Sequence, residues 1–169
     1  MLNRVPLLFL VAAGIAMATA MLDESTLNIA LSDNTGPTRP VISSHGSMVT
    51  AISAGQRGQF TAETLVNGVH VQMMADTGAT VVTLTSFDAQ RIGFDLEWLE
   101  FDRPIRTANG TALAAGITLD KLSVGGIEIR DVSAIVVKPG LLAHSLLGMS
   151  FLGAISRFEI KGDQMVLYR

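Results

Sequence analysis

Tight turn signals recur along this chain between short apolar runs. Asn67-Gly68 separates residues 59–66 from residues 69–75, and Asn-Gly in such a position is the strongest short-range signal for a β-hairpin. A second Asn-Gly pair follows at 109–110, and Gly125-Gly126 marks a further turn. Short strands at regular spacing, without a repeat of roughly 20 to 50 residues, predict an all-β domain, either a barrel or a sandwich.

Short helices are expected at two places in this strand pattern. Thr85 or Ser86 can cap a helix that ends at Gly93, a residue suited to the left-handed conformation after a helix. The apolar run 145–153 predicts a strand followed by a short helix. Residues 155–169 predict two closing strands, with turn residues between them.

The amino terminus carries an export signal. Residues 5–22 are apolar apart from one threonine, with Arg4 before them and Asp23 and Glu24 after them. This charge asymmetry predicts a cytoplasmic amino terminus and a following domain across the membrane, in the periplasm of a bacterium. The small residues at 18–20 fit a cleavage site, whereas the length of the run approaches that of a membrane span, so residues 1–22 are either a signal peptide or a signal anchor in the inner membrane.

A polar segment follows the leader. Residues 23–55 are rich in Ser, Thr, Asn, Gly and Pro and lack sustained periodicity, which predicts a flexible tether. Residues 48–52 alternate well enough to form a strand within it. We expect the folded domain to occupy residues 56–169, or to begin earlier with this strand at residue 48.

Composition excludes several functional classes. The 169-residue chain has a formal net charge of −3 and a single Trp, which argues against nucleic acid as a partner. The absence of Cys removes thiolate nucleophiles and Cys-based zinc sites. His45, His70 and His144 lack the spacing of metal ligands, so no metal site is expected.

Asp76 is the candidate functional residue, because it stands at the end of an apolar run. An ionised carboxylate in such a place needs hydrogen bonds or a partner charge. Thr77 supplies a hydroxyl and Gly78 permits a turn that aims backbone N–H groups at the carboxylate. The alternatives are a loop Asp that caps its own turn and an acceptor or magnesium ligand for phosphoryl transfer.

An apolar run leads into Asp76-Thr77-Gly78-Ala79-Thr80, and Asn109-Gly110 and Leu146-Leu147-Gly148 follow about thirty and about seventy residues later. Together these motifs resemble the retropepsin-like aspartic proteases, specifically a bacterial membrane-tethered branch with one such domain. The resemblance covers roughly residues 58–169 and implies a closed barrel with a flap hairpin and one or two short helices, preceded by a hydrophobic helix. It implies Asp76 as the catalytic carboxylate, with support from Thr77, Gly78 and Ala79. It further implies a flap at Ala108, Asn109 and Gly110, and a supporting strand at Leu146, Leu147 and Gly148.

The implied activity is that of an aspartic endopeptidase. Two carboxylates sharing one proton are needed, and this chain has one Asp-Thr-Gly, so the resemblance implies a homodimer in which two copies of Asp76 meet. Water is the nucleophile, a peptide or protein is the substrate, and no cofactor is required. The rival hypothesis is a catalytically silent peptide-binding or dimerisation module with the same fold.

Two positions depart from the retroviral pattern. Retroviral enzymes usually carry a paired Asp and Arg where this chain has Thr80 and Met149. Because both charges are absent together, no unpaired buried charge is left behind.

Overall fold

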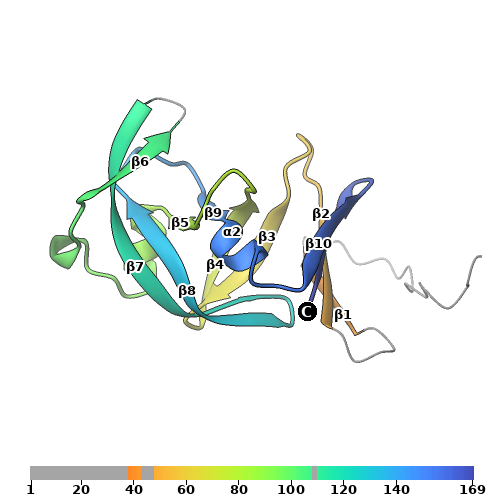
Figure 1. Ribbon diagram of the computed structural model, residues 1–169. Coiled ribbons are helices and arrows are strands. Elements are labelled where there is room, and N and C mark those ends of the chain that lie inside the picture. Colours follow the sequence, from red (N-terminus) through yellow and green to blue (C-terminus); the bar gives the residue numbers. More distant parts are fainter. Residues whose placement is uncertain (1–37, 43–47, 108–109) are drawn as a thin grey trace, which may run out of the picture. The chain divides into compact units, whose positions relative to one another are not determined.

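The computed structural model describes residues 38–42, 48–107 and 110–169 (Figure 1). The expected hydrophobic segment at residues 1–22 and the flap residues Ala108 and Asn109 lie outside these ranges. Within the described ranges, no helix has both the length and the apolar character that crossing a membrane requires.

A closed barrel of six strands forms the larger part of the fold. Its strands follow the order β3-β4-β9-β5-β8-β7, and pairing of β3 with β7 closes the ring. The barrel contains two parallel pairs, β4 with β9 and β5 with β8, among antiparallel ones. Its members are β3 (Thr61–Val66), β4 (Val69–Ala75), β5 (Val82–Leu84), β7 (Gly110–Val124), β8 (Ile127–Val137) and β9 (Ser145–Leu147). This architecture confirms the prediction of a closed barrel.

A second, four-stranded antiparallel sheet has the order β1-β2-β11-β10. Its strands are β1 (Thr38–Ile42), β2 (Met48–Ser53), β10 (Arg157–Lys161) and β11 (Gln164–Tyr168). Two of these strands therefore lie inside the segment 23–55 that was expected to be a tether, so regular structure begins before residue 56. The strand expected at residues 48–52 forms as β2 and pairs with the distant strand β11, whereas β1 was not expected.

The Asn67-Gly68 hairpin forms as predicted between β3 and β4. Asn67 has φ 49° and Gly68 has φ 89°, the left-handed conformations that a tight hairpin turn requires. Residues 110–124 form the single long strand β7. Its pairing with β8 continues on both sides of Asp120 and Asp131, which have no partner in the register.

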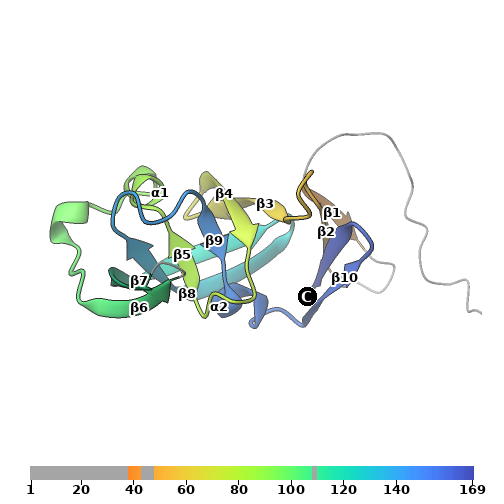
Figure 2. The same ribbon diagram turned by 90° about the horizontal axis from the view of Figure 1, so that it is seen from above.

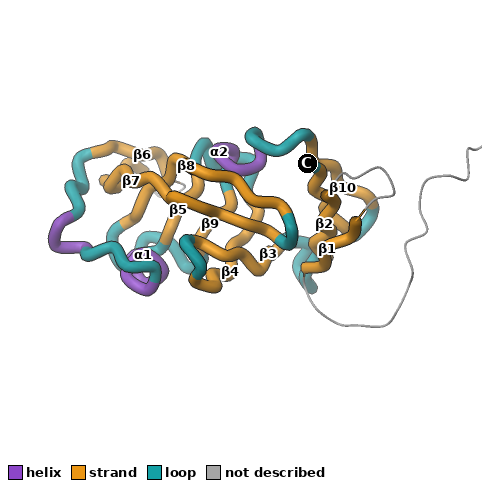
Figure 3. Tube along the Cα trace, turned by 90° about the horizontal axis from the view of Figure 1, so that it is seen from below, coloured by secondary structure: helices purple, strands orange, loops and turns teal. Residues whose placement is uncertain are grey.

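Short helices lie on opposite sides of β5 and β9 (Figures 2 and 3). Helix α1 (Ser86–Arg91) begins at Thr85, whose side chain accepts a hydrogen bond from the Asp88 backbone N–H, as the sequence predicted. Helix α2 (Met149–Leu152) follows β9 directly. The 3-10 helix η1 (Leu96–Trp98), which the sequence analysis did not predict, lies between α1 and the next strand.

One hydrophobic core joins the barrel to the four-stranded sheet. Fully buried Leu119, Leu147 and Phe151 from the barrel side belong to the same cluster as Ile52 and Leu167 from the sheet. Strand β5 is buried along its whole length, which is characteristic of a strand covered on both faces. The segment that follows β4 is thereby connected to a strand with little freedom to move.

Among the described strands, β6 (Arg103–Thr107) pairs with β7 alone and forms the edge of its sheet. The β6–β7 hairpin extends beyond the end of β8 (Figure 1). Apart from Ile105, the residues of β6 are exposed, so little apolar burial fastens this hairpin to the core.

Candidate active site

Asp76 directly follows β4 and is half-buried. Its Oδ1 accepts a hydrogen bond of 2.8 Å from the Gly78 backbone N–H, as the sequence predicted for this turn. Within the described part of the chain, no group donates a hydrogen bond to its Oδ2. One carboxylate oxygen is therefore fixed by the turn, and the other is available to a water or a substrate atom.

Strand β9 and the start of α2 hold the Asp76 loop through backbone groups. The Asp76 N–H donates to the Leu147 carbonyl at 3.1 Å, and the Met149 N–H donates to the Ala79 carbonyl at 2.8 Å. Residues 146–148, predicted as the supporting strand, thus lie against the loop that carries Asp76.

Gly148 lets these two segments approach one another. A Cβ atom at this position would lie 2.2 Å from the Val81 carbonyl oxygen and 2.9 Å from that of Ala79. Real Cβ atoms are not found so close to backbone atoms, so only glycine fits without displacing the loop.

Ser150 contacts the backbones of two strands, and the sequence did not predict this contact. Its hydroxyl accepts a hydrogen bond of 2.9 Å from the Val82 N–H and donates one of 2.7 Å to the Ser133 carbonyl. The partners are 68 and 17 residues away in sequence, so no local pattern points to the contact.

Thr80 and Met149, which depart from the retroviral pattern, lie in surroundings that suit uncharged side chains. Thr80 is exposed, and Met149 is partly buried and packs against the hydrophobic core. An apolar contact thus occupies a position where the retroviral pattern has a charge.

In the β6–β7 hairpin, where the flap was expected, the Thr107 hydroxyl donates to the Gly110 carbonyl at 2.8 Å. Gly110 has φ 115°, a conformation that favours glycine. Of the three residues expected at the flap, Gly110 is thus placed at the start of β7, and the other two lie outside the described residues.

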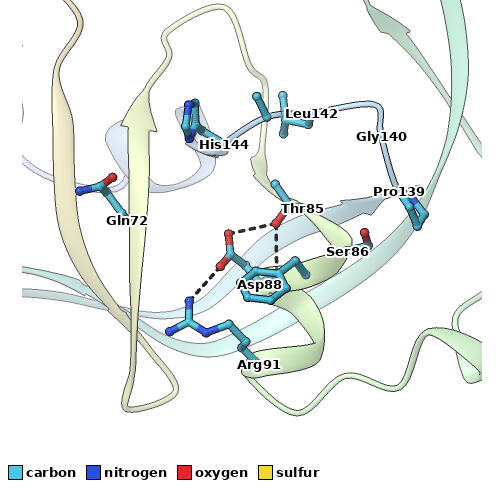
Figure 4. A pocket seen from close by; sticks show the side chains of 11 residues that line it. Gln72, Thr85, Ser86, Asp88, Arg91, Pro139, Gly140, Leu142 and His144 are labelled. Atoms are coloured by element: carbon cyan, nitrogen blue, oxygen red, sulfur yellow. Dashed lines mark hydrogen bonds and ion pairs between the residues drawn. The ribbon is translucent and has the colours of Figure 1, made fainter.

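A cavity of about 450 Å³ opens elsewhere, between α1 and the loop before β9 (Figure 4). Its lining includes Gln72, Asp88, Arg91 and His144 but none of residues 76–79. Asp88 faces Thr85 and Arg91 there, at 3.0 Å and 3.1 Å. The cavity therefore does not contain the predicted site.

The Asp88 carboxylate also holds β9, the strand that lies against the Asp76 loop. Asp88 Oδ2 accepts a hydrogen bond of 2.6 Å from the hydroxyl of buried Ser145, the first residue of β9. Arg91 in turn donates to the His70 carbonyl in β4 at 2.9 Å. Helix α1 thus fixes the starts of both strands that meet at Asp76.

Fold and site together define a class: the fold is that of the retropepsin-like aspartic proteases. A retropepsin-like aspartic protease from Rickettsia conorii superposes with a TM-score of 0.64 at 36% identity, over 72% of this chain and 91% of that one. The EIAV protease in complex with the inhibitor HBY-793 superposes with a TM-score of 0.53 over 65% of this chain and all of that one. At 16% identity, the second likeness concerns the fold alone.

The chain belongs to the family described as gag-polyprotein putative aspartyl protease, whose model matches residues 62–154. A Sinorhizobium protein encoded in the cobV 5′ region is 36% identical over 75% of this chain and 54% of its own length. A protein of Rickettsia prowazekii is 41% identical over 65% of this chain and 47% of its own length. This chain therefore spans about half the length of the curated relatives that it matches.

Proposed function

We propose that this protein is an aspartic endopeptidase whose active site is completed by Asp76 of a second copy. The observation that carries the proposal is the Asp76 carboxylate itself, which is held at one oxygen by Gly78 and has no donor at the other among the described residues. Among the described residues, Asp76 forms no hydrogen bond with another carboxylate. A two-fold homodimer supplies the second carboxylate without a second motif in the chain.

The chemistry follows from two carboxylates that share one proton. The ionised carboxylate removes a proton from a water molecule, and the protonated one donates a hydrogen bond to the carbonyl oxygen of the scissile peptide. The water oxygen adds to the carbonyl carbon, the C–N bond breaks, and the amine leaves with a proton. The two macroscopic pKa values of such a dyad belong to the pair and not to either residue.

The test is the substitution Asp76→Asn in the full chain. It preserves shape but removes the ionisable group, and we expect hydrolysis of a casein-type substrate to fall by at least about a thousandfold. Asp163→Asn is the matched control, because Asp163 is an exposed residue of the β10–β11 turn, and it should retain full activity.

Inhibitors separate the proposal from its rivals. A statine-type compound should abolish the activity, whereas a metal chelator should leave it unchanged. Inhibition by the chelator would favour a metal-dependent phosphoryl-transfer site. Unchanged proteolysis after Asp76→Asn would contradict the protease proposal and leave a peptide-binding module of the same fold.

We further propose that the domain acts at the periplasmic face of the inner membrane. The proposal is supported by the apolar run at residues 5–22 and its asymmetric flanking charges. Fractionation of cells that express the full chain, followed by amino-terminal sequencing, tests both the location and the removal of the leader.

A further inference from the structure

The hydroxyl of Ser150 lies between two strands at the point where their pairing begins. Val82 and Ala134 form the first pair of the parallel β5–β8 ladder. The hydroxyl accepts from the Val82 N–H at 2.9 Å and donates to the carbonyl of Ser133, next to Ala134, at 2.7 Å. One side chain thus links the backbones of β5 and β8, much as a bridging water would.

This contact fixes the far end of the loop that carries Asp76. The loop begins at the Asp76 N–H, which is held by Leu147, and is held again at the Ala79 carbonyl by Met149. Both of those contacts use backbone groups that any residue type except proline would supply. At Val82 the loop passes into β5, and there the contact depends on a side chain.

The environment of Val82 makes this hydrogen bond hard to replace. Val82 is fully buried, so its N–H would be left without an acceptor if the hydroxyl of Ser150 were removed. An unpaired buried N–H is costly, and the backbone is expected to shift in order to find a partner. Strand β5 is buried along its whole length, so we expect the shift to fall on the other side of Val82, in the loop that leads back to Asp76.

We propose that Ser150 is a positioning residue that sets the geometry of Asp76 through the end of its loop. The inference rests on the proposed function, since it concerns the alignment of Asp76 for proteolysis. A misplacement of about 1 Å can cost about a hundredfold in rate, because the reacting groups must be aligned before the barrier is crossed. Ser150 contacts neither substrate nor reacting atoms in this scheme.

The test compares three variants of the full chain. Ser150→Ala deletes the bridge, and Ser150→Thr retains a hydroxyl at the same position. Ser53→Ala is the control, because it removes an exposed serine of β2 whose side chain makes no hydrogen bond to the described residues. We expect Ser150→Ala to lower kcat at least tenfold with KM changed less than about twofold. The other two variants should remain within about threefold of the parent.

Amide hydrogen exchange supplies a readout that does not depend on activity. In Ser150→Ala the Val82 amide should exchange at least about tenfold faster, which corresponds to the loss of one hydrogen bond of about 1.4 kcal/mol. Exchange at β3 and β11 should not change.

The kinetic and exchange results together distinguish a positioning role of Ser150 from a purely structural one. A Ser150→Ala protein that melts at a lower temperature but keeps its kcat well below the melting temperature would overturn the positioning role. Failure of Ser150→Thr to restore kcat, with a slow Val82 amide, would overturn it as well. If the parent protein itself cleaves no substrate, the proposed function fails separately, and unchanged exchange at Val82 in Ser150→Ala would then overturn the structural half of the inference.

Discussion

At the scale of single residues, the site depends on positions where the chain permits very few side chains. Asp76 is held by one backbone N–H from its own turn, and its loop is held by groups on β9 and α2. Gly148 stands where these two segments come closest. Its φ of −88° is accessible to any residue, so the requirement for glycine at this position is steric and not conformational.

Gly148→Ala tests this steric requirement. The new Cβ would meet backbone atoms of Val81 and Ala79, which cannot rotate away as side-chain atoms can. We expect the free energy of unfolding to fall by about 2 kcal/mol, the usual scale for overpacking, together with a large loss of proteolysis because the Asp76 loop must shift. Denaturant unfolding and the casein-type assay measure the two effects.

Gly58→Ala provides the contrast. Nothing lies within 4 Å of a Cβ atom there, but φ is +78°, so the cost is about 1 kcal/mol of backbone strain without an effect on activity. A Gly148→Ala protein that resembles Gly58→Ala in both measurements would contradict the steric explanation.

At the scale of elements, the β10–β11 hairpin carries a charged cluster on its surface. Glu159 accepts a hydrogen bond from the Tyr168 hydroxyl and forms an ion pair with Lys161 at 3.0 Å. The guanidinium of Arg157 lies 4.0 Å from the centre of the Tyr168 ring. These contacts lower the pKa of Glu159 below its ordinary value of 4.5, with the Tyr168 hydrogen bond as the largest cause and Lys161 next.

This pKa shift predicts a pH dependence of stability. Because the folded-state pKa of Glu159 is depressed, its contribution is fully present above the unfolded value near 4.5 and is lost as the pH falls through the lower folded value. Glu159→Gln should therefore reduce the drop in melting temperature between pH 6 and pH 3. The control is Glu97→Gln, an exposed residue of η1. A Glu159→Gln protein with the same acid dependence as the parent would show that the cluster does not contribute.

The elements that the sequence predicted are those specified by local signals. Asn67-Gly68 fixes a hairpin through the left-handed preference of two adjacent residues, and Thr85 begins α1 through its own side chain. The alternation at residues 48–52 also predicted strand β2, although its position beside β11, more than 100 residues later, is set by tertiary structure. The contact of Ser150 was not foreseen, because Ser150 meets Val82 across 68 residues and leaves no periodic pattern in the neighbouring sequence.

In the site, too, the residues that could be predicted are those that belong to contiguous sequence motifs. Asp76 and residues 146–148 could be named because their short motifs are contiguous. The network of Asp88, Ser145 and Arg91 could not, because it draws on α1, β9 and β4, and each member alone is an ordinary polar residue. Tertiary structure alone brings these groups together.

At the scale of the whole molecule, the proposed dyad ties activity to association. If two copies of Asp76 form one site, the rate per chain depends on the fraction of chains that are paired. For a variant without residues 1–22, we expect activity to rise faster than linearly with protein concentration around the dissociation constant. Initial rates over a dilution series, with sedimentation analysis of the same samples, measure this dependence. Strict proportionality at dilutions where only monomers sediment would contradict a site shared between chains.

The four-stranded sheet sets an order of events during synthesis. Strand β2 emerges from the ribosome early and can pair with β1, but its other neighbour, β11, is made more than 100 residues later. The nascent chain therefore carries one edge of β2 unpaired while the barrel strands are produced. Such an edge is a hazard for association with other unfinished chains, and translation rate and chaperone supply should affect the yield of this protein more than its final stability does.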